Sequence, residues 1–175
     1  LGEKTADDLS RDISRVYQNP EDMFTTDSIH ADIAYAMQVR DLPDWQDRTH
    51  ALLERFRLTP LQDRDGRLMS GGQMRRASLA IGVALNPGVL LLDEPTANLD
   101  IATRREIMAV LDDMKDIIQT AAIATHDMQL VCHCAGRIIV LRGGRVVADG
   151  APDAIFAPGG RGGQYATAPP ALSLT

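Results

Sequence analysis

Two neighbouring carboxylates, Asp93 and Glu94, directly follow the apolar run at residues 89–92. A short, continuous apolar run is typical of a strand buried on both faces of a parallel sheet. Ligands of open α/β sheets bind beyond the carboxyl ends of the strands. Asp93 could therefore hold a hydrated Mg²⁺ that bridges nucleotide phosphates, and Glu94 could polarise a water molecule for attack on a phosphate. Alternatively, the pair could be two acidic residues that simply begin a loop.

A second group of residues, Ser70, Gly71, Gly72 and Gln73, begins a helix predicted to run to about residue 85. Small residues at a helix start leave backbone N–H groups and the positive end of the helix dipole open to an anion. The serine hydroxyl adds one more donor. The alternative is an ordinary N-cap followed by flexible glycines.

Two further polar residues follow predicted strands. His126 comes after the strand at 121–124, which we expect to be buried, and Gln18 ends the strand at 13–17. A neutral imidazole can donate a hydrogen bond to a phosphate oxygen and accept another elsewhere. Gln18 could ligate Mg²⁺ through its amide oxygen or orient a water molecule. Taken alone, each could equally be structural, as a packing histidine or a turn residue.

The cysteines Cys132 and Cys134 flank His133, but we do not interpret this run as a metal site. The segment after residue 127 is predicted to be helical, and helix positions two apart do not share a face. Zinc sites usually draw on a second ligand pair as well, and the sequence contains none. Reduced thiols in a cytosolic protein are the simpler interpretation. We interpret His30, His50 and His133 as surface or packing residues.

The elements that must position these residues alternate between strands and helices. Strands are predicted at 13–17, 89–92 and 121–124, and a terminal hairpin at 137–142 and 145–149. Helices are predicted at 28–39, 44–56, 70–85 and 101–118, the last with Asp100 as its N-cap. This alternation predicts an α/β fold with a mostly parallel sheet sandwiched by helices.

The same pattern predicts four regions along the chain. Residues 1–17 belong to the sheet core, 18–69 form an inserted helical subdomain, 70–156 carry the residues described above, and 157–175 form a flexible tail rich in Gly, Pro and Ala. With 175 residues, 45% of them hydrophobic, the chain can bury a substantial core. Its net charge of −6 argues against a dedicated nucleic-acid surface, so we expect no nucleic-acid partner.

In this order and spacing, these segments resemble the nucleotide-binding domain of the ABC ATPase superfamily over about residues 1–156. Residues 68–76 resemble the family's signature, with Met69 where leucine is usual. Residues 89–94 resemble the Walker B strand, and residues 97–100 resemble the D-loop. Gln18 matches the Q-loop glutamine and His126 the switch histidine. The resemblance implies a partial P-loop-NTPase-type fold.

The resemblance also implies roles for these residues, with ATP and Mg²⁺ as cofactors. Glu94 would be the general base, and His126 would contact the γ-phosphate. Asp93 and Gln18 would hold Mg²⁺. The residues implied in ATP binding, several of them reaching the nucleotide of a second ATPase domain in a head-to-tail dimer, are Gln18, Ser70, Gly71, Gly72, Gln73 and Asp100.

Residues 16–22 look like the Q-loop of the energy-coupling-factor and cobalt-type import ATPases. That finer resemblance implies ATP-driven import of a vitamin or metal ion through an integral membrane subunit, which Gln18 would help to contact. The protein would then lie at the cytoplasmic face of the cell membrane.

One expected motif is missing from the 175 residues: the P-loop pattern Gly-x-x-x-x-Gly-Lys-Ser/Thr. The sequence of residues 2–5, Gly-Glu-Lys-Thr, lacks both the earlier glycine and the glycine directly before lysine. In the family the P-loop lies upstream of the Q-loop strand, so we expect a truncated domain that binds ATP poorly, has little ATPase activity and self-associates through exposed apolar edges.

Two alternatives remain open at this point. The chain could be a non-hydrolysing partner that lends Ser70, Gly71 and Gly72 to another subunit's ATP, although Glu94 and His126 are both intact. It could also be a soluble ABC ATPase acting on DNA or in translation. The insert of about 50 residues before the signature is shorter than the coiled coils usual in the DNA-repair members.

Overall fold

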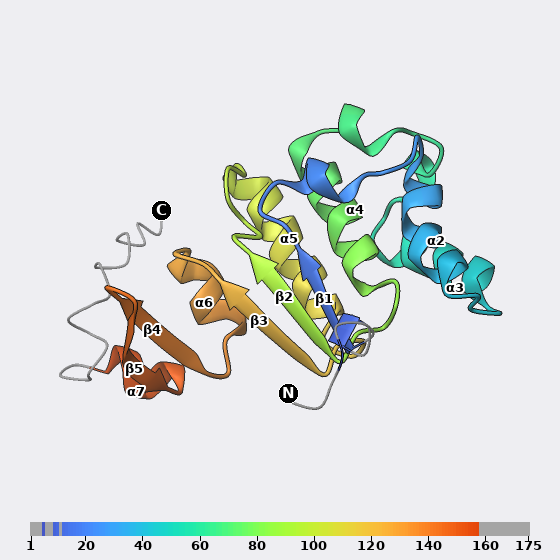
Figure 1. Ribbon diagram of the computed structural model, residues 1–175. Coiled ribbons are helices and arrows are strands. Elements are labelled where there is room, and N and C mark those ends of the chain that lie inside the picture. The colour runs from blue at the N-terminus through green and yellow to red at the C-terminus, as the bar shows by residue number, and fades with distance from the viewer. Residues whose placement is uncertain (1–4, 6–8, 11, 158–175) are drawn as a thin grey trace. The chain divides into compact units, whose positions relative to one another are not determined.

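The computed structural model describes residues 5, 9, 10 and 12–157, which form two compact units divided after His126 (Figure 1). The flexible tail predicted at 157–175 lies outside the described residues from 158 onwards. Residues 2–4 of the Gly-Glu-Lys-Thr segment also lie outside them. The two units are described separately below.

The first unit is built on a three-stranded sheet in the order β1-β2-β3. Its strands are β1 (Ile13–Val16), β2 (Val89–Asp93) and β3 (Thr120–Ala124), and all are parallel. Val16 pairs with Leu92, and Asp93 pairs with Ala124, so the carboxyl ends of the three strands meet at one edge. The predicted parallel sheet and its three strands are confirmed.

Two helices of 13 residues each, α4 (Gly71–Val83) and α5 (Ile101–Asp113), form the helical layer of this unit (Figure 1). The sheet residues Val16, Leu90 and Leu92 are buried. Helix α4 approaches this face closely at Gly82, where an added Cβ would lie 2.5 Å from Cγ2 of Val16. Alternate residues of β1 and β2 therefore pack on α4 and form the core.

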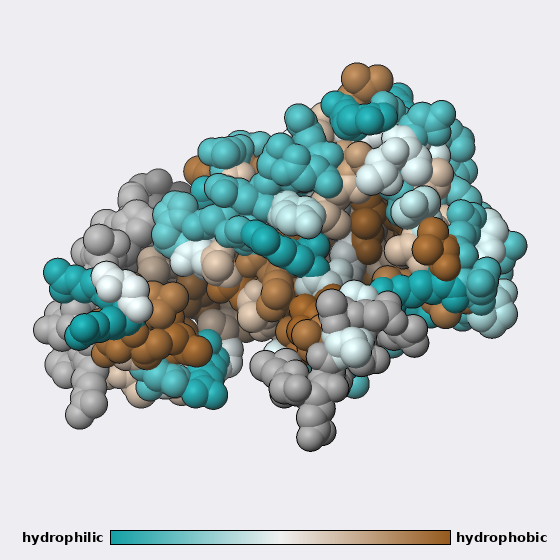
Figure 2. All heavy atoms as spheres, in the orientation of Figure 1, coloured by the Kyte–Doolittle hydropathy of each residue, from teal (hydrophilic) through white to brown (hydrophobic). Residues whose placement is uncertain are grey.

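The opposite face of the sheet is open in the part of the chain that the structure describes. Leu91, which points to that face, is 38% exposed, and Ala122 and Ala124 of β3 are exposed. Figure 2 shows apolar side chains at the surface over the strands. The expectations that 89–92 is buried on both faces and that 121–124 is buried are therefore wrong for the described residues. β3 pairs with β2 alone among the described strands.

Between β1 and α4 lies a helical insert, as predicted. It contains α2 (Ile29–Val39), α3 (Trp45–Arg55) and three 3₁₀ turns: Pro20–Met23, Thr59–Leu61 and Gly66–Leu68. Its own apolar core consists of fully buried side chains: Ile29, Ile33, Met37, Leu53, Phe56 and Leu58. The predicted helices at 28–39 and 44–56 match α2 and α3 to within one residue at each end.

The helix predicted at 101–118 ends earlier than expected. Helix α5 stops at Asp113, with Met114 as its C-cap, and residues 115–117 continue as turns. At its other end Asp100 is the N-cap, as predicted, since its side chain accepts a hydrogen bond from the Thr103 amide.

The second unit contains α6 (Met128–Cys134), the hairpin of β4 (Ile138–Arg142) and β5 (Arg145–Gly150), and α7 (Pro152–Phe156). The hairpin is confirmed. Its turn residues Gly143 and Gly144 both have positive φ, as a two-residue type I′ turn requires. Arg137 lowers the pKa of the Asp149 carboxyl through a two-pronged ion pair with both contacts at 2.8 Å. Among the described residues no helix is long and apolar enough to cross a bilayer.

Candidate functional site

The carboxyl edge of the sheet brings together residues that lie far apart in the sequence. Asp93 ends β2, and the Glu94 amide continues the pairing by donating to the Ala124 carbonyl at 2.9 Å. Gln18 follows β1 by two residues, and His126 follows β3 by two. The sheet therefore places the acid pair and the imidazole on one edge, as the sequence predicted.

The Glu94 carboxylate is held by the residues after β3. Its Oε2 accepts a hydrogen bond from the Thr125 hydroxyl at 3.0 Å, and its Oε1 accepts one from the His126 amide at 3.2 Å. The imidazole Nδ1 of His126 lies 2.5 Å from the same Oε1. The Glu94 side chain is 19% exposed, whereas that of His126 is 87% exposed. The carboxylate is thus oriented from one side, while the imidazole extends into solvent.

The donor in this contact depends on the tautomer of the imidazole. An ionised carboxylate can only accept hydrogen bonds, so beside an ionised Glu94 the Nδ1 of His126 would be the donor. Nε2 of a neutral ring is then an acceptor. In that tautomer, only the protonated ring could donate from Nε2 to a phosphate oxygen while Nδ1 donates to Glu94.

Asp93 has a partner that the sequence analysis did not anticipate. Its carboxylate lies 3.2 Å from the Arg15 guanidinium, which in turn lies over the Tyr17 ring at 5.0 Å from the ring centroid. The two charged side chains are 39% and 55% exposed. An exposed ion pair contributes little to stability, so a cation could replace Arg15 at Asp93 at small cost.

Asp93 and Gln18 fit a magnesium site in which nucleotide phosphates and waters supply the remaining ligands. No group of three or more His, Cys, Asp or Glu side chains in the described residues could hold a metal ion. Mg²⁺, however, is commonly held by one or two carboxylates together with substrate phosphates and waters. The accessible Asp93 carboxylate and the exposed Gln18 on the same edge meet that requirement without a full protein cage.

The start of α4 is closed by a reciprocal pair of hydrogen bonds. The Ser70 hydroxyl accepts from the Gln73 amide at 3.4 Å, and the Gln73 side-chain oxygen accepts from the Ser70 amide at 3.2 Å. The Gln73 side chain is thereby engaged at its own helix terminus. Ser70 and Gly71 are exposed, so this helix start remains open to a ligand or a partner.

The starts of α4 and α5 pack against each other. An added Cβ on Gly72 would lie 2.4 Å from Cγ2 of Thr103, whereas one on Gly71 would lie 3.9 Å from Leu99. Asp100 caps α5 by accepting from the Thr103 hydroxyl at 2.6 Å and from its amide at 3.0 Å. These hydrogen bonds lower the pKa of the Asp100 carboxyl. Gly72 is therefore needed for close helix packing, a reason that the sequence analysis did not supply.

Arg75 is a further residue that the sequence analysis missed. It lies on α4, is 3% exposed, and donates to the main-chain carbonyls of Tyr17 at 3.0 Å and Gln18 at 2.8 Å. Burial lowers the pKa of its guanidinium. One signal was available: Arg75 lies three and four positions before Ser78 and Leu79, on the buried stripe of the helix. A charged residue on such a stripe needs specific partners.

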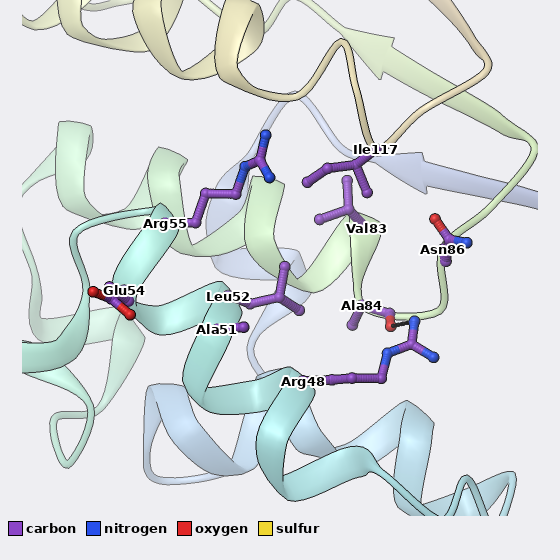
Figure 3. A pocket seen from close by; sticks show the side chains of 9 residues that line it. All are labelled: Arg48, Ala51, Leu52, Glu54, Arg55, Val83, Ala84, Asn86 and Ile117. Atoms are coloured by element: carbon purple, nitrogen blue, oxygen red, sulfur yellow. Dashed lines mark hydrogen bonds between the residues drawn. The ribbon is translucent and has the colours of Figure 1, made fainter.

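A separate hollow of about 410 Å³ lies between α3, the end of α4 and the turn after α5 (Figure 3). Its lining combines apolar residues such as Leu52, Val83 and Ile117 with charged and polar ones. The Arg48 guanidinium donates to the Ala84 carbonyl at 3.0 Å. None of the site residues predicted from the sequence lines this hollow, so it is distinct from the sheet edge.

The remaining histidines and the cysteines form no comparable group. Cys132 is exposed, and the Cys134 thiol donates to the Leu130 carbonyl at 3.0 Å. The His30 and His50 rings lie 5.8 Å apart on α2 and α3.

Comparison with known proteins identifies the family. The sequence profile described as ABC transporter matches residues 1–97. The energy-coupling factor transporter ATP-binding protein EcfA1 of Enterococcus faecalis is 33% identical over 162 residues, covering 91% of this chain and 58% of that protein. The cobalt import ATP-binding protein CbiO of Rhodobacter capsulatus is 33% identical over 155 residues, covering 87% of this chain and 55% of that protein.

The fold agrees with this similarity. The solved structure of cbiO1 from Clostridium perfringens, part of the ABC transporter complex cbiONQ, superposes with a TM-score of 0.77 at 33% identity, covering 85% of this chain and 60% of the other. The chain thus spans a little over half the length of the relatives it matches. On the profile, the relatives and the shared fold, this chain belongs to the ABC transporter family.

Proposed function

We propose that this chain carries the hydrolytic residues of the ATP-binding subunit of an ABC importer. In the assembled protein it would hydrolyse ATP as one of two head-to-tail domains and drive a small solute, a vitamin or a metal ion, through a membrane subunit. The names of its relatives support this class of cargo, since they are ATP-binding proteins of energy-coupling-factor transport and cobalt import.

The observation that carries the proposal is the fixed Glu94 carboxylate at the carboxyl edge of a parallel sheet. Thr125 and the His126 amide orient it, and it lies beside Asp93 in sequence and at the same edge. A carboxylate held in place and only 19% exposed is suited to accept a proton from an attacking water molecule.

The other edge residues supply charge and orientation around this base. Asp93 and Gln18 would hold Mg²⁺, which when bound neutralises charge on the nucleotide phosphates. Asp93 would release Arg15 in doing so. The exposed ring of His126 would reach a phosphate oxygen from Nε2, in the protonated form, while its Nδ1 keeps Glu94 in position.

The open start of α4 is suited to a second domain's nucleotide. Ser70 and Gly71 are exposed, and backbone N–H groups at a helix N-terminus attract a phosphate. Asp100, at the adjacent start of α5, would lie at the same domain interface. We expect the subunit to act at the cytoplasmic face of the membrane, without a nucleic-acid partner.

A kinetic experiment tests the proposal. In the complete subunit assembled with its membrane partner, Glu94→Gln should reduce Mg²⁺-dependent ATP hydrolysis by about 10²–10⁴-fold, the usual contribution of a general base. The matched control is Glu54→Gln, the same chemical change at an exposed position on α3. Full hydrolysis in the Glu94 variant would overturn the proposal.

Two alternatives predict other results. A subunit that only lends its Ser70 region would tolerate Glu94→Gln but lose its partner's activity on Ser70→Arg. A soluble ABC ATPase would co-purify with ribosomes or DNA and not with a membrane subunit. The oriented Glu94 favours the hydrolytic subunit over the first alternative, because a lending subunit has no use for a positioned base.

A further inference from the structure

Arg75 is a buried cation whose guanidinium binds main-chain carbonyls. Its two terminal nitrogens donate to the carbonyls of Tyr17 and Gln18, and its Nε is buried without a hydrogen-bond partner among the described residues. It lies on the signature helix α4, whereas its two acceptors directly follow β1, 58 and 57 positions away in sequence.

This arrangement is expensive for a purely structural contact. Removing a guanidinium from water carries a large desolvation penalty, which neutral carbonyls offset less well than a carboxylate would. The rest of this stripe on α4 packs through small or apolar residues such as Leu79 and Gly82. An apolar side chain at position 75 would pack there without that penalty, so the bidentate contact needs a reason beyond stability.

Arg75 joins two segments that have different roles in the proposed site. Gln18 belongs to the sheet edge that would hold Mg²⁺, and Ser70, five residues before Arg75, opens toward the second domain. The 3₁₀ turn Pro20–Met23, which follows Gln18, packs on α4 as well. A shift of the Gln18 backbone must either break two hydrogen bonds to a buried charge or carry α4 with it.

We infer that Arg75 is a positioning residue that ties the main chain at Tyr17 and Gln18 to the signature helix, so that the two parts of the site move as one. This inference rests on the proposed function. It gives Gln18 a second task, carried by its carbonyl and not by its side chain.

The first test measures whether Arg75 holds the main chain after β1 in place, and it does not depend on ATPase activity. When Arg75 is replaced by methionine, amide hydrogen exchange of the 175-residue chain should become faster at Asp22 and Phe24. The amides of these two residues donate hydrogen bonds within the turn after Gln18. Arg75→Lys should give an intermediate result, because an ammonium cannot hold both carbonyls in a fixed fork. Unchanged exchange at both amides would overturn the inference.

The second test measures coupling in the complete subunit with its membrane partner. Arg75→Met should lower kcat for ATP by about tenfold or more, as expected when a catalytic segment is misplaced, while KM changes little. Gln18→Ala should also lower kcat. In the double variant the losses should not add, because both changes interrupt one unit.

The matched control is Arg48→Met. Arg48 also donates from a guanidinium to one main-chain carbonyl of this helix region, that of Ala84, but at the opposite end of α4. It should leave kcat unchanged. Fully additive losses at positions 18 and 75, or a normal kcat in both Arg75 variants, would refute the coupling.

The two proposals can fail separately. If the wild type lacks ATP hydrolysis that depends on Glu94, the proposed function fails, and the exchange measurement still decides whether Arg75 holds the turn. If hydrolysis depends on Glu94 and both Arg75 variants turn over normally, only the inference about Arg75 fails.

Discussion

At the scale of single residues, the candidate site depends on how the Glu94 carboxylate is oriented. Glu94 has a positive φ of 46°, an uncommon conformation for a residue other than glycine. Such strain persists where the surroundings hold the residue in place, and here Thr125 and His126 do so from the neighbouring strand end. Thr125 and His126 therefore hold the acid in this conformation.

Thr125→Val should lower kcat of the complete subunit by about tenfold or more. A hydrogen bond to a charged group contributes about 1.5–3 kcal/mol, and valine keeps the shape of threonine without the donor. Steady-state kinetics would measure it, with Thr125→Ser as the control that retains the hydroxyl. A kcat equal to that of the wild type in the valine variant would show that His126 alone orients Glu94.

The lowered pKa of Asp100 predicts that the stability contributed by this helix cap depends on pH. Hydrogen bonds from Thr103 hold its folded pKa below the ordinary value of 3.8. Because the folded pKa is the lower one, the stabilisation is complete above 3.8 and is lost as pH falls through the folded pKa. An NMR titration of the Asp100 carboxyl should show this midpoint below the ordinary value. In Asp100→Asn, which still caps the helix but does not titrate, that part of the acid sensitivity should disappear.

At the scale of elements, the close packing of α4 on α5 explains why two adjacent glycines are not equivalent. Gly72 faces the Thr103 methyl, which cannot easily rotate away because the Thr103 hydroxyl is bonded to Asp100. Gly71 has only an ordinary contact with Leu99. The same small substitution should therefore have opposite effects at the two positions.

Gly72→Ala should destabilise the chain by about 1–3 kcal/mol, the usual cost of overpacking. Gly71→Ala should be neutral or stabilise it by up to about 1 kcal/mol, because alanine restricts the unfolded chain more than glycine does. Urea unfolding of the 175-residue chain would measure both. Thr103→Ser, which removes only the methyl, should restore most of the stability lost in Gly72→Ala. Without such rescue, the loss would have a cause other than this contact.

At the scale of the whole molecule, the described chain exposes apolar surface on the open face of its sheet and along β3. Leu91 is 38% exposed, and on β3 Ala121, Ala122 and Ala124 are exposed. A strand with an unpaired edge and small apolar side chains is a template for pairing with another chain. The isolated chain should therefore associate with itself.

Sedimentation velocity over a range of protein concentrations should show this association, and Ala122→Lys on β3 should weaken it, since a charge on an edge strand opposes pairing. Ala51→Lys, the same change at an exposed position of α3, is the control and should leave the self-association unchanged. A monomer at all concentrations would contradict the prediction. The same isolated chain, which lacks the P-loop pattern, should also hydrolyse ATP poorly.

The sequence by itself determined the order of the elements and the shared edge. Apolar runs, helix caps and turn residues are local patterns, so the three parallel strands, the helical insert and the hairpin could be predicted to within a few residues. Polar residues after parallel strands must gather at one edge, which placed Asp93, Glu94 and His126 together. The family motifs then gave these positions their expected chemistry.

Only the tertiary structure decided the contacts across the fold. Which face of the sheet the helices cover, the Arg15 contact with Asp93, the Thr103 methyl against Gly72 and the Arg75 bonds to the chain after β1 all join residues that are distant in sequence. Such pairings depend on how the elements pack, and the spacing of residues along the chain does not determine that packing. The side-chain partners of Glu94 belong with them, because they arise from two strands whose register is set only when the sheet forms.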